Sequence, residues 1–310
     1  MNKIIFIVGP TASGKTDISI AVAKRVQGEI ISADSMQVYR GLDIGTAKIT
    51  AEQKAAVPHH LIDVIEPSEE FSIHEFRKQA LDAISAIHAR QHIPIVVGGS
   101  GLYVKALMDG LSPHPGEDVL LRQSLRERAA NEGLASLYGE LFRCDPVTAA
   151  RIKPQDARRI IRALEVYRLS GTPLSAWEQE TKSLAENGYM VQYFGIVRDR
   201  AELYARVHER VDAMLAHGLL DEAKHLWGQA LSKTTRQAVG YKELFMYYAG
   251  ECSSGEAIAL IKKNTRHLVK KQFTWFRKDK RIEWIDVTGL TDYAPVVTAL
   301  SNRITEKEAI

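Results

Sequence analysis

The stretch Gly9-Pro10-Thr11-Ala12-Ser13-Gly14-Lys15-Thr16 is a complete phosphate-binding loop of the form G-x-x-x-x-G-K-[ST]. An apolar run at 4–8 precedes it and an amphipathic segment at 18–26 follows it, so the motif has the strand–turn–helix context that it requires. Glycines let backbone N–H groups close around phosphate oxygens, and the helix start adds partial positive charge. We therefore expect all eight residues to bind a di- or triphosphate, with Lys15 as a mobile cation and Thr16 as a ligand of Mg²⁺.

The first hundred residues alternate short β-rich runs with helical patterns, which is typical of a parallel α/β sheet. Strands are expected at 3–8, 29–33 and 93–97, with a further candidate at 60–65. A capping box of Ser72 and Glu75 predicts a helix that runs to about position 91. The predicted fold class is α/β, with a phosphate-loop-type parallel sheet as its core.

The pattern changes near 113–116, and residues 118 to about 188 look helical throughout, with no strand candidate. Within this block, 159–170 is a clear amphipathic helix that Gly171 and Pro173 stop. Strand character returns at 190–197, and helices dominate 199–278, including one capped by Ser253 and Glu256. A last strand is expected at 282–287. We therefore predict a core formed by 1–115 and 190–310, interrupted by an all-helical insertion domain at 116–189 that contacts a partner.

The composition is that of a soluble globular protein: 45% of the 310 residues are hydrophobic and 25% are charged. No apolar run is long enough to span a bilayer, and the first one is too short for a signal peptide. Cys144 and Cys252 stand far apart, which argues against a disulfide framework or a zinc site and fits a reducing compartment. The expectation is a cytoplasmic monomer that does not contact a membrane.

The net charge of +3 is too small to indicate nucleic-acid binding, but the basic residues are clustered. One cluster comprises Lys262, Lys263, Arg266, Lys270, Lys271, Arg277, Lys278, Lys280 and Arg281, and the other Arg151, Lys153, Arg158, Arg159, Arg162 and Arg168. Such runs are usually solvated helix faces. Two of them in a chain with a phosphate site favour a polyanionic partner.

Asp34 follows the second predicted strand directly, at the strand end where ligands bind in open α/β sheets. It could act as a general base, orient a substrate or cap the next turn. The strand at 93–97 ends in Gly98-Gly99-Ser100-Gly101 and lacks the metal-holding acid of nucleotide hydrolases, which weakens that function but leaves small-molecule kinases open. Ser100 is interpreted as a hydrogen-bonding group in a tight turn.

Two further groups allow less specific interpretations. His59 and His60 are adjacent, so their side chains diverge and a metal site with Asp63 is a minor alternative. Trp275, with Phe273 and Phe276, lies among basic residues; such aromatics are mostly core, and base stacking is the minority interpretation.

A series of motifs runs in order along most of the chain. They are the phosphate loop, Asp34-Ser35-Met36-Gln37-Val38-Tyr39, Asp43-Ile44-Gly45-Thr46-Ala47-Lys48, His59-His60-Leu61-Ile62-Asp63, Gly98-Gly99-Ser100-Gly101-Leu102-Tyr103, Arg158-Arg159-Ile160-Ile161-Arg162-Ala163-Leu164-Glu165, Arg210-Val211-Asp212-Ala213-Met214 and Gln237-Ala238-Val239-Gly240-Tyr241-Lys242-Glu243. With them the chain resembles the tRNA dimethylallyltransferases, also called tRNA isopentenyltransferases. Ser100 stands where the family more often has threonine. Some eukaryotic relatives carry a zinc-finger extension whose cysteines are not found here, so the compact bacterial form is expected.

The resemblance implies transfer of a dimethylallyl group from dimethylallyl diphosphate to N6 of adenine 37, next to the anticodon of tRNA, with release of diphosphate. The phosphate loop would then hold the prenyl diphosphate, with no nucleotide needed. Asp34 is the candidate base that takes the amine proton. The loop amides, Lys15, a Mg²⁺ held partly by Thr16 and an arginine between 206 and 210, with Arg210 favoured, would stabilise the leaving group.

The target base is stacked in the anticodon stem-loop and must be splayed out to react. The resemblance assigns tRNA contacts to Asp34, Ser35, Met36, Gln37, Ser100, Arg122, Arg158, Arg159, Ile160, Ile161, Arg162, Arg236, Gln237, Gly240 and Tyr241. Two other functions stay open: a small-molecule or nucleoside kinase, and a phosphate-loop RNA-binding protein without transferase activity.

Overall fold

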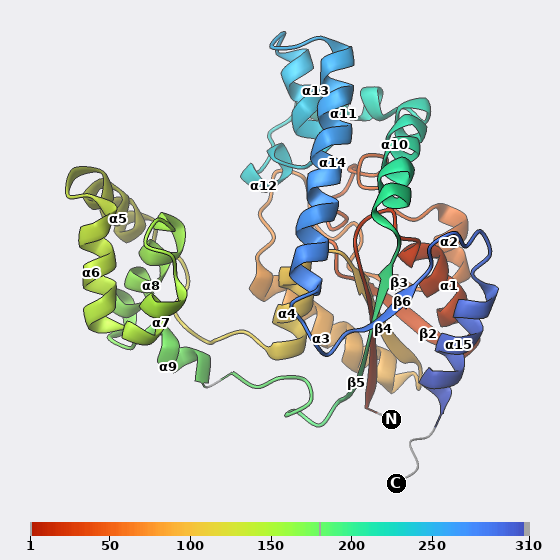
Figure 1. Cartoon of the computed structure of the whole chain (residues 1–310), viewed down its shortest axis with the longest axis horizontal. Helices are drawn as coiled ribbons and strands as arrows, with labels where there is room; N and C mark the ends of the chain where they lie inside the picture. Colours follow the sequence, from red (N-terminus) through yellow and green to blue (C-terminus); the bar gives the residue numbers. More distant parts are fainter. Residues whose placement is uncertain (1, 180, 307–310) are drawn as a thin grey trace. The chain divides into compact units, whose positions relative to one another are not determined.

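A computed structural model describes residues 2–179 and 181–306 of the chain. These residues form two compact units, one made of Met1–Met108 with Leu184–Ile310 and the other of Asp109–Ser183 (Figure 1). The first unit contains the sheet and the second is helical, and each is described by itself below. No described helix has the length and apolar character needed to cross a membrane.

The sheet of the first unit contains six parallel strands, in the order β3-β2-β4-β1-β5-β6. The strands are β1 (Lys3–Val8), β2 (Gly28–Ser32), β3 (His59–His60), β4 (Ile93–Gly98), β5 (Met190–Val197) and β6 (Glu283–Asp286). The predicted parallel α/β fold is therefore confirmed. The strands β1, β2 and β4 end side by side at one edge, the place where the phosphate loop, Asp34 and the glycine turn leave the sheet.

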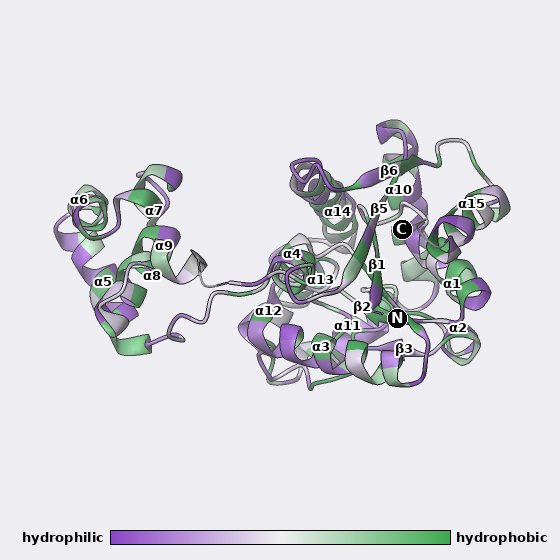
Figure 2. Ribbon diagram, turned by 90° about the horizontal axis from the view of Figure 1, so that it is seen from below, coloured by the Kyte–Doolittle hydropathy of each residue, from purple (hydrophilic) through white to green (hydrophobic). Residues whose placement is uncertain are grey.

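Both faces of the sheet are buried, which explains why its central strands are apolar without alternation. Ile5 and Ile7 of β1 face a cluster that contains α1 and α15, while Ile4 and Phe6 face the larger cluster on the other side. The helices of this unit are α1 (Lys15–Val26), α2 (Ala51–Ala56), α3 (Ile73–Ala89), α4 (Gly101–Asp109), α10 (Arg200–Ala216), α11 (Leu219–Trp227), α12 (Lys233–Arg236), α13 (Tyr241–Tyr248), α14 (Ser254–Phe276) and α15 (Ala294–Thr305). Figure 2 shows α1 and α15 together on one side of the strands.

The strand expected at 60–65 is wrong beyond its first residue. Leu61 and Asp63 adopt left-handed backbone conformations, with φ of 62° and 58°, which end the extended chain after His60. The segment returns as a turn in which the N–H groups of Val64 and Ile65 both donate to the carbonyl oxygen of Val38. It thereby packs against the chain that follows Asp34.

The described residues of the second unit form five helices: α5 (Val119–Asn131), α6 (Leu134–Cys144), α7 (Pro146–Arg151), α8 (Ala157–Ser170) and α9 (Leu174–Gln179). Its apolar core includes Leu125, Leu141 and Leu164, which are completely buried. The expectation of helix up to about 188 is wrong for residues 181–188: residues 181–183 have no regular secondary structure and residues 184–188 form turns. Leu184 is responsible, because its side chain is buried in the core of the first unit and its N–H donates to the carbonyl oxygen of Met108.

Candidate active site

The phosphate loop follows β1 and wraps the start of α1. Gly9 has a φ of 146°, and a Cβ at this position would lie 2.4 Å from the carbonyl oxygen of Ile196, so only glycine fits. Gly14 forms the N-cap of α1, which places Lys15 and the exposed Thr16 in the first turn of that helix. The hydroxyl of Ser13 is buried and has no hydrogen-bond partner among the described residues. An orphaned buried donor in this loop fits an anion site.

Side chains from distant parts of the chain hold the loop from behind. The guanidinium of Arg206 donates to the carbonyl oxygen of Ala12 at 3.0 Å, and that of Arg198 donates to the carbonyl oxygen of Ser13 at 3.2 Å. Arg198 is itself buried and also bonds Glu202 and the hydroxyl of Tyr293. The two guanidinium groups therefore brace the loop through its carbonyl oxygens.

Positive charge gathers beside the loop without matching negative charge. Burial and the neighbouring Arg210 lower the pKa of Lys15 to about 7, against a smaller opposing effect of Asp34. Burial also lowers the pKa of Arg210, as does Arg206, while Asp34 raises it. Lys15, Arg206 and Arg210 thus form a cation cluster in which neighbouring charges influence one another, and Asp34 is the one carboxylate among the causes of these two pKa shifts. An incoming anion would relieve the repulsion between the cations.

Asp34 and its neighbours lie at the ends of β2 and β4. The carboxylate of Asp34 accepts the N–H of Met36 at 2.9 Å, which fixes its position in a local turn. Ser100 accepts the N–H of Ser35 at 3.0 Å and donates to its hydroxyl at 3.2 Å. Ser100 therefore does act as a hydrogen-bonding group in the turn. The same turn brings it next to the Asp34 segment, 65 positions away in the sequence.

Gln37 is fixed by polar contacts on both sides of its side chain. Its amide oxygen accepts the hydroxyl of Ser32 at 3.0 Å, and its amide nitrogen donates to the carbonyl oxygen of Thr46. The predicted residues Asp34 to Gln37 thus form one connected, half-buried group at the sheet edge.

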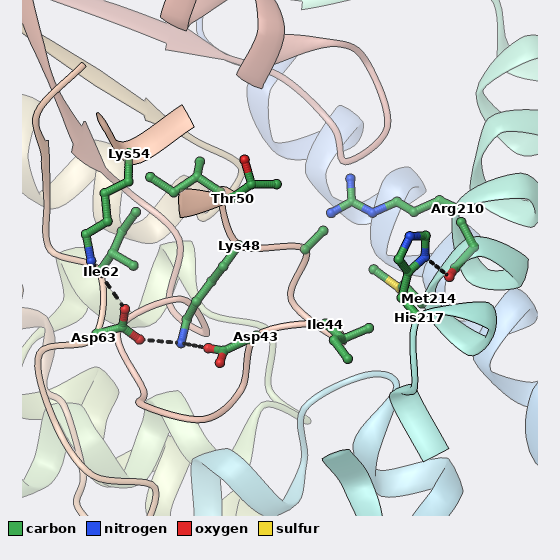
Figure 3. Close-up of a pocket in the computed structure, with 13 residues that line it drawn as sticks. Asp43, Ile44, Lys48, Thr50, Lys54, Ile62, Asp63, Arg210, Met214 and His217 are labelled. Carbon is green, nitrogen blue, oxygen red and sulfur yellow. Dashed lines mark hydrogen bonds and ion pairs between the residues drawn. The ribbon is translucent and has the colours of Figure 1, made fainter. Parts of the chain in front are cut away.

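A pocket of about 490 Å³ is lined in part by residues on either side of Thr46, the partner of Gln37. It is lined by Asp43, Ile44, Ala47, Lys48, Ile49, Thr50, Lys54, Ile62, Asp63, Arg210, Ala213, Met214 and His217. Figure 3 shows the side chain of Lys48 between Asp43 and Asp63, with Arg210 reaching in from α10. The ammonium of Lys48 lies 2.7 Å from Asp43 and 2.6 Å from Asp63, so its charge is compensated. Arg210 lines the pocket and also belongs to the cation cluster at the phosphate loop, so the pocket adjoins that cluster.

Two minor alternatives remain to be compared with the structure: a metal site at His59 and His60, and base stacking on Trp275. His60 bonds Glu29 at 2.7 Å and His59 bonds the carbonyl oxygen of Val57, so the two rings serve different partners. Within 2–179 and 181–306 no group of three or more His, Cys, Asp or Glu side chains is placed to hold a metal ion. Trp275 is 41% exposed, whereas Phe276 belongs to the core.

The predicted tRNA contacts of the second unit separate into three kinds. Arg158 and Arg159 are exposed on α8. The side chains of Ile160 and Ile161 are buried in the apolar core, and their assignment to tRNA stays a prediction. Arg122 and Arg162 are half-buried and engage the completely buried carboxylate of Glu165, with 2.8 Å between Arg122 and that carboxylate. Arg162 also donates to the carbonyl oxygens of Pro115 and Gly116. The side chains of Arg122 and Arg162 are therefore bonded to partners within the second unit.

A similar division applies at the C-terminal side of α12. Arg236 and Gln237 are exposed, while Gly240 and Tyr241 are buried. The hydroxyl of Tyr241 donates to Glu222 at 2.6 Å. The ring of Tyr241 is thus buried with a partner inside the first unit, and its assignment to tRNA stays a prediction.

Two contacts near the site are not predicted by the sequence. Gln272 of α14 accepts the N–H of Thr11 at 2.8 Å, and Glu222 of α11 accepts backbone N–H groups from the pocket wall. Neither glutamine nor glutamate stands in a local motif that predicts such a partner. The capping box at Ser253 predicts the helix that contains Gln272, but not the contact of Gln272 with Thr11.

A phosphate loop at the carboxyl edge of a parallel sheet, with a cluster of cations facing one carboxylate, defines a P-loop-type enzyme acting on a diphosphate or triphosphate. The family described as IPP transferase matches residues 37–279, and the one described as isopentenyl transferase matches residues 2–63. The chain belongs to the IPP transferase family.

Individual relatives agree with the family. The tRNA dimethylallyltransferase of Symbiobacterium thermophilum is 50% identical over 92% of this chain and 90% of its own length. The crystal structure of the full-length tRNA isopentenylpyrophosphate transferase from Bacillus halodurans has a TM-score of 0.73 and is 42% identical, covering 98% of this chain and 96% of that one. The crystal structure of a eukaryotic dimethylallyltransferase acting on tRNA has a TM-score of 0.83 and is 29% identical, covering 97% of this chain and 78% of that one. The expected family and enzyme class, a prenyltransferase, are confirmed, and the kinase alternative is not favoured.

Proposed function

We propose that this chain transfers the dimethylallyl group of dimethylallyl diphosphate to N6 of adenine 37 in tRNA. The observation that supports this most is the cation cluster of Lys15, Arg206 and Arg210 beside the phosphate loop. It interacts with Asp34 and adjoins a pocket whose lining includes Ile44, Ile49 and Met214. A prenyl diphosphate has a strongly anionic head, which matches the cation cluster, and a short branched apolar tail, which matches the apolar residues of the pocket.

The diphosphate head is assigned to residues Gly9 to Thr16. Backbone N–H groups of the loop, the buried hydroxyl of Ser13 and the start of α1 offer donors to phosphate oxygens. Lys15 and Arg210 would neutralise the charge that develops on the departing diphosphate. A divalent ion, with Mg²⁺ as our proposal, would be held by diphosphate oxygens and the Thr16 hydroxyl and would spread that charge further. The exposed position of Thr16 in the first helical turn fits this role.

The tail is assigned to the pocket, against Ile44, Ile49 and Met214. This places the reacting carbon near Arg210 and Asp34, between the head and the acceptor base. In the transfer, N6 of the adenine forms a bond to that carbon, the carbon–oxygen bond to diphosphate breaks, and the electron pair leaves with diphosphate. The carboxylate of Asp34 takes the proton that the amine loses.

For tRNA we propose the exposed Arg158 and Arg159 of the second unit and the exposed Arg236 and Gln237 of the first. Asp34 to Gln37, with Ser100, would meet the extruded base. The sequence predicts a helical insertion at 116–189, and the second compact unit of the structure is Asp109–Ser183. This helical unit would bind the anticodon arm. Arg122 and Arg162 would support that surface through Glu165.

The test incubates the purified protein and Mg²⁺ with dimethylallyl diphosphate and unmodified tRNA, followed by nucleoside mass analysis. A matched tRNA with guanine at position 37 serves as the control. The proposal expects a dimethylallyl mass gain on adenosine in the first tRNA and none in the second. A gain in both tRNAs would contradict the assigned position. No gain with dimethylallyl diphosphate, together with consumption of ATP in a parallel sample, would favour the kinase.

A further inference from the structure

Glu222 lies outside the pocket, yet its carboxylate collects hydrogen bonds from the wall of that pocket. It accepts the N–H groups of Asp43 at 3.0 Å, Ile44 at 2.8 Å and Gly45 at 3.0 Å. The hydroxyl of Tyr241 donates to the same carboxylate at 2.6 Å. Three consecutive backbone donors that converge on one carboxylate form an anion nest whose occupant is part of the chain itself.

The segment held in this way supplies a large part of the pocket. Six of the lining positions, 43, 44 and 47–50, follow one another along it. The same segment presents the carbonyl oxygen of Thr46 to Gln37, and Lys48 to Asp43 and Asp63. A displacement at Glu222 would therefore move both this wall of the pocket and the support of the Asp34 group.

Tyr241 closes the arrangement from the other side. Its ring is completely buried and lies against Gly45, where an added Cβ would stand 2.6 Å from a ring carbon. Gly45 is thus needed for close approach, not for a special backbone angle. The ring fixes the distance of the segment from α13, and Glu222 fixes the direction of its N–H groups.

We propose that Glu222 and Tyr241 are positioning residues that set the width of the pocket and thereby its preference for a short prenyl tail. The inference rests on the proposed function, because it takes the pocket occupant to be that tail. Charge matters here as well as shape. An amide at this position would offer one acceptor and would turn its own N–H groups toward backbone donors.

The test compares Glu222→Gln and Tyr241→Phe with Asp221→Asn, which removes a charge at the neighbouring, exposed position of the same helix turn. Three quantities are measured for each variant: the KM for dimethylallyl diphosphate, the Ki of geranyl diphosphate as a competitor, and the Kd for inorganic pyrophosphate. A role limited to folding would lower the active fraction and kcat, but would leave the ratio of Ki to KM unchanged.

For Glu222→Gln the inference expects KM to rise about tenfold, the loss typical of one charge-assisted hydrogen bond. The ratio of Ki to KM should fall by about threefold or more while the pyrophosphate Kd stays within about twofold, since the phosphate loop is untouched. Asp221→Asn should match the wild type. Should Glu222→Gln fail to fold, Tyr241→Phe, which keeps the ring and removes a single donor, should change the ratio in the same direction.

A wild-type ratio in Glu222→Gln and Tyr241→Phe would overturn the inference, provided that the wild-type protein transfers dimethylallyl groups. A parallel loss of pyrophosphate binding would overturn it too, because the effect would then extend beyond the pocket wall. If the wild-type protein itself transfers nothing, the proposed function fails instead, so the two failures are distinguishable.

Discussion

The side-chain carbonyl oxygen of Gln272 accepts the backbone N–H of Thr11 at 2.8 Å, although 261 positions separate the two residues. The same side chain lies against Gly99, where an added Cβ would come within 2.4 Å of its amide nitrogen. One glutamine of the basic helix α14 thus contacts both the phosphate loop and the turn that precedes Ser100.

Replacing Gln272 by leucine should weaken the binding of inorganic pyrophosphate. The N–H of Thr11 would lose its protein partner and the loop would lose one of its braces, so we expect the Kd to rise about fivefold, as for one neutral hydrogen bond. Calorimetric titration measures this. Thr274→Val, two positions away on the exposed side of the helix, is the control. Equal affinities in wild type and Gln272→Leu would show that the contact does not shape the loop.

Pyrophosphate binding should depend on pH through Lys15, whose pKa is lowered to about 7. Below pH 7 the ammonium is charged and ready for the anion. As the pH rises through 7, the free protein loses this proton, and a bound diphosphate must restore it. Affinity should therefore fall above pH 7, by up to about tenfold per pH unit until the pKa of the bound state is reached.

The matched variant for this effect is Lys15→Arg, because arginine stays charged throughout the range. Its profile also contains the ionisation of pyrophosphate itself, so the difference between the two profiles isolates Lys15. Parallel profiles would mean that Lys15 titrates well above pH 7 in the free protein.

Much of the architecture could be predicted from sequence because its signals are local. The bounds of β1 and β5 agree with their apolar runs, and the capping boxes at Ser72 and Ser253 mark helix starts. The strand expected beyond His60 failed because left-handed conformations at non-glycine residues have no strong sequence signature.

The site was predictable in part for the same reason. The phosphate loop and Asp34 stand at strand ends, and Arg206 and Arg210 are one helical turn apart on α10. Glu222 and Gln272 could not be found, because their partners lie far away in the sequence and hydrogen bonds to backbone groups leave no pattern. By contrast, the burial of Ile160 and Ile161 follows from the amphipathic pattern of the helix that contains them.

Asp34→Asn should separate catalysis from binding. Asparagine keeps an oxygen that can accept the N–H of Met36, so the turn is preserved, but it cannot take the proton of the amine. We expect kcat to fall about a hundredfold or more, as for removal of a general base, with pyrophosphate and tRNA affinities nearly unchanged. Steady-state kinetics and filter binding measure both quantities. A kcat within a few-fold of wild type would remove Asp34 from this role.

The arginines of α8 should differ in what they contribute. Arg158→Ala with Arg159→Ala should weaken tRNA binding and reduce the slope of log K against log salt by about two, one for each phosphate contact. Arg162→Ala should instead destabilise the helical unit, since it leaves the buried Glu165 with one partner fewer. Binding at several salt concentrations and thermal unfolding distinguish the two effects. An unchanged slope in the double variant would identify that face as merely solvated.

The central claim is that the phosphate loop binds the prenyl diphosphate whose tail is transferred to tRNA. Its most direct test is the single-turnover rate of dimethylallyl transfer to unmodified tRNA, measured at saturating donor in the wild-type protein and in Lys15→Met. We predict that the wild-type protein forms dimethylallyl-adenosine and that the variant is slower by about a hundredfold or more, because a cation aimed at the leaving diphosphate is lost. Equal rates in the two proteins would contradict the account.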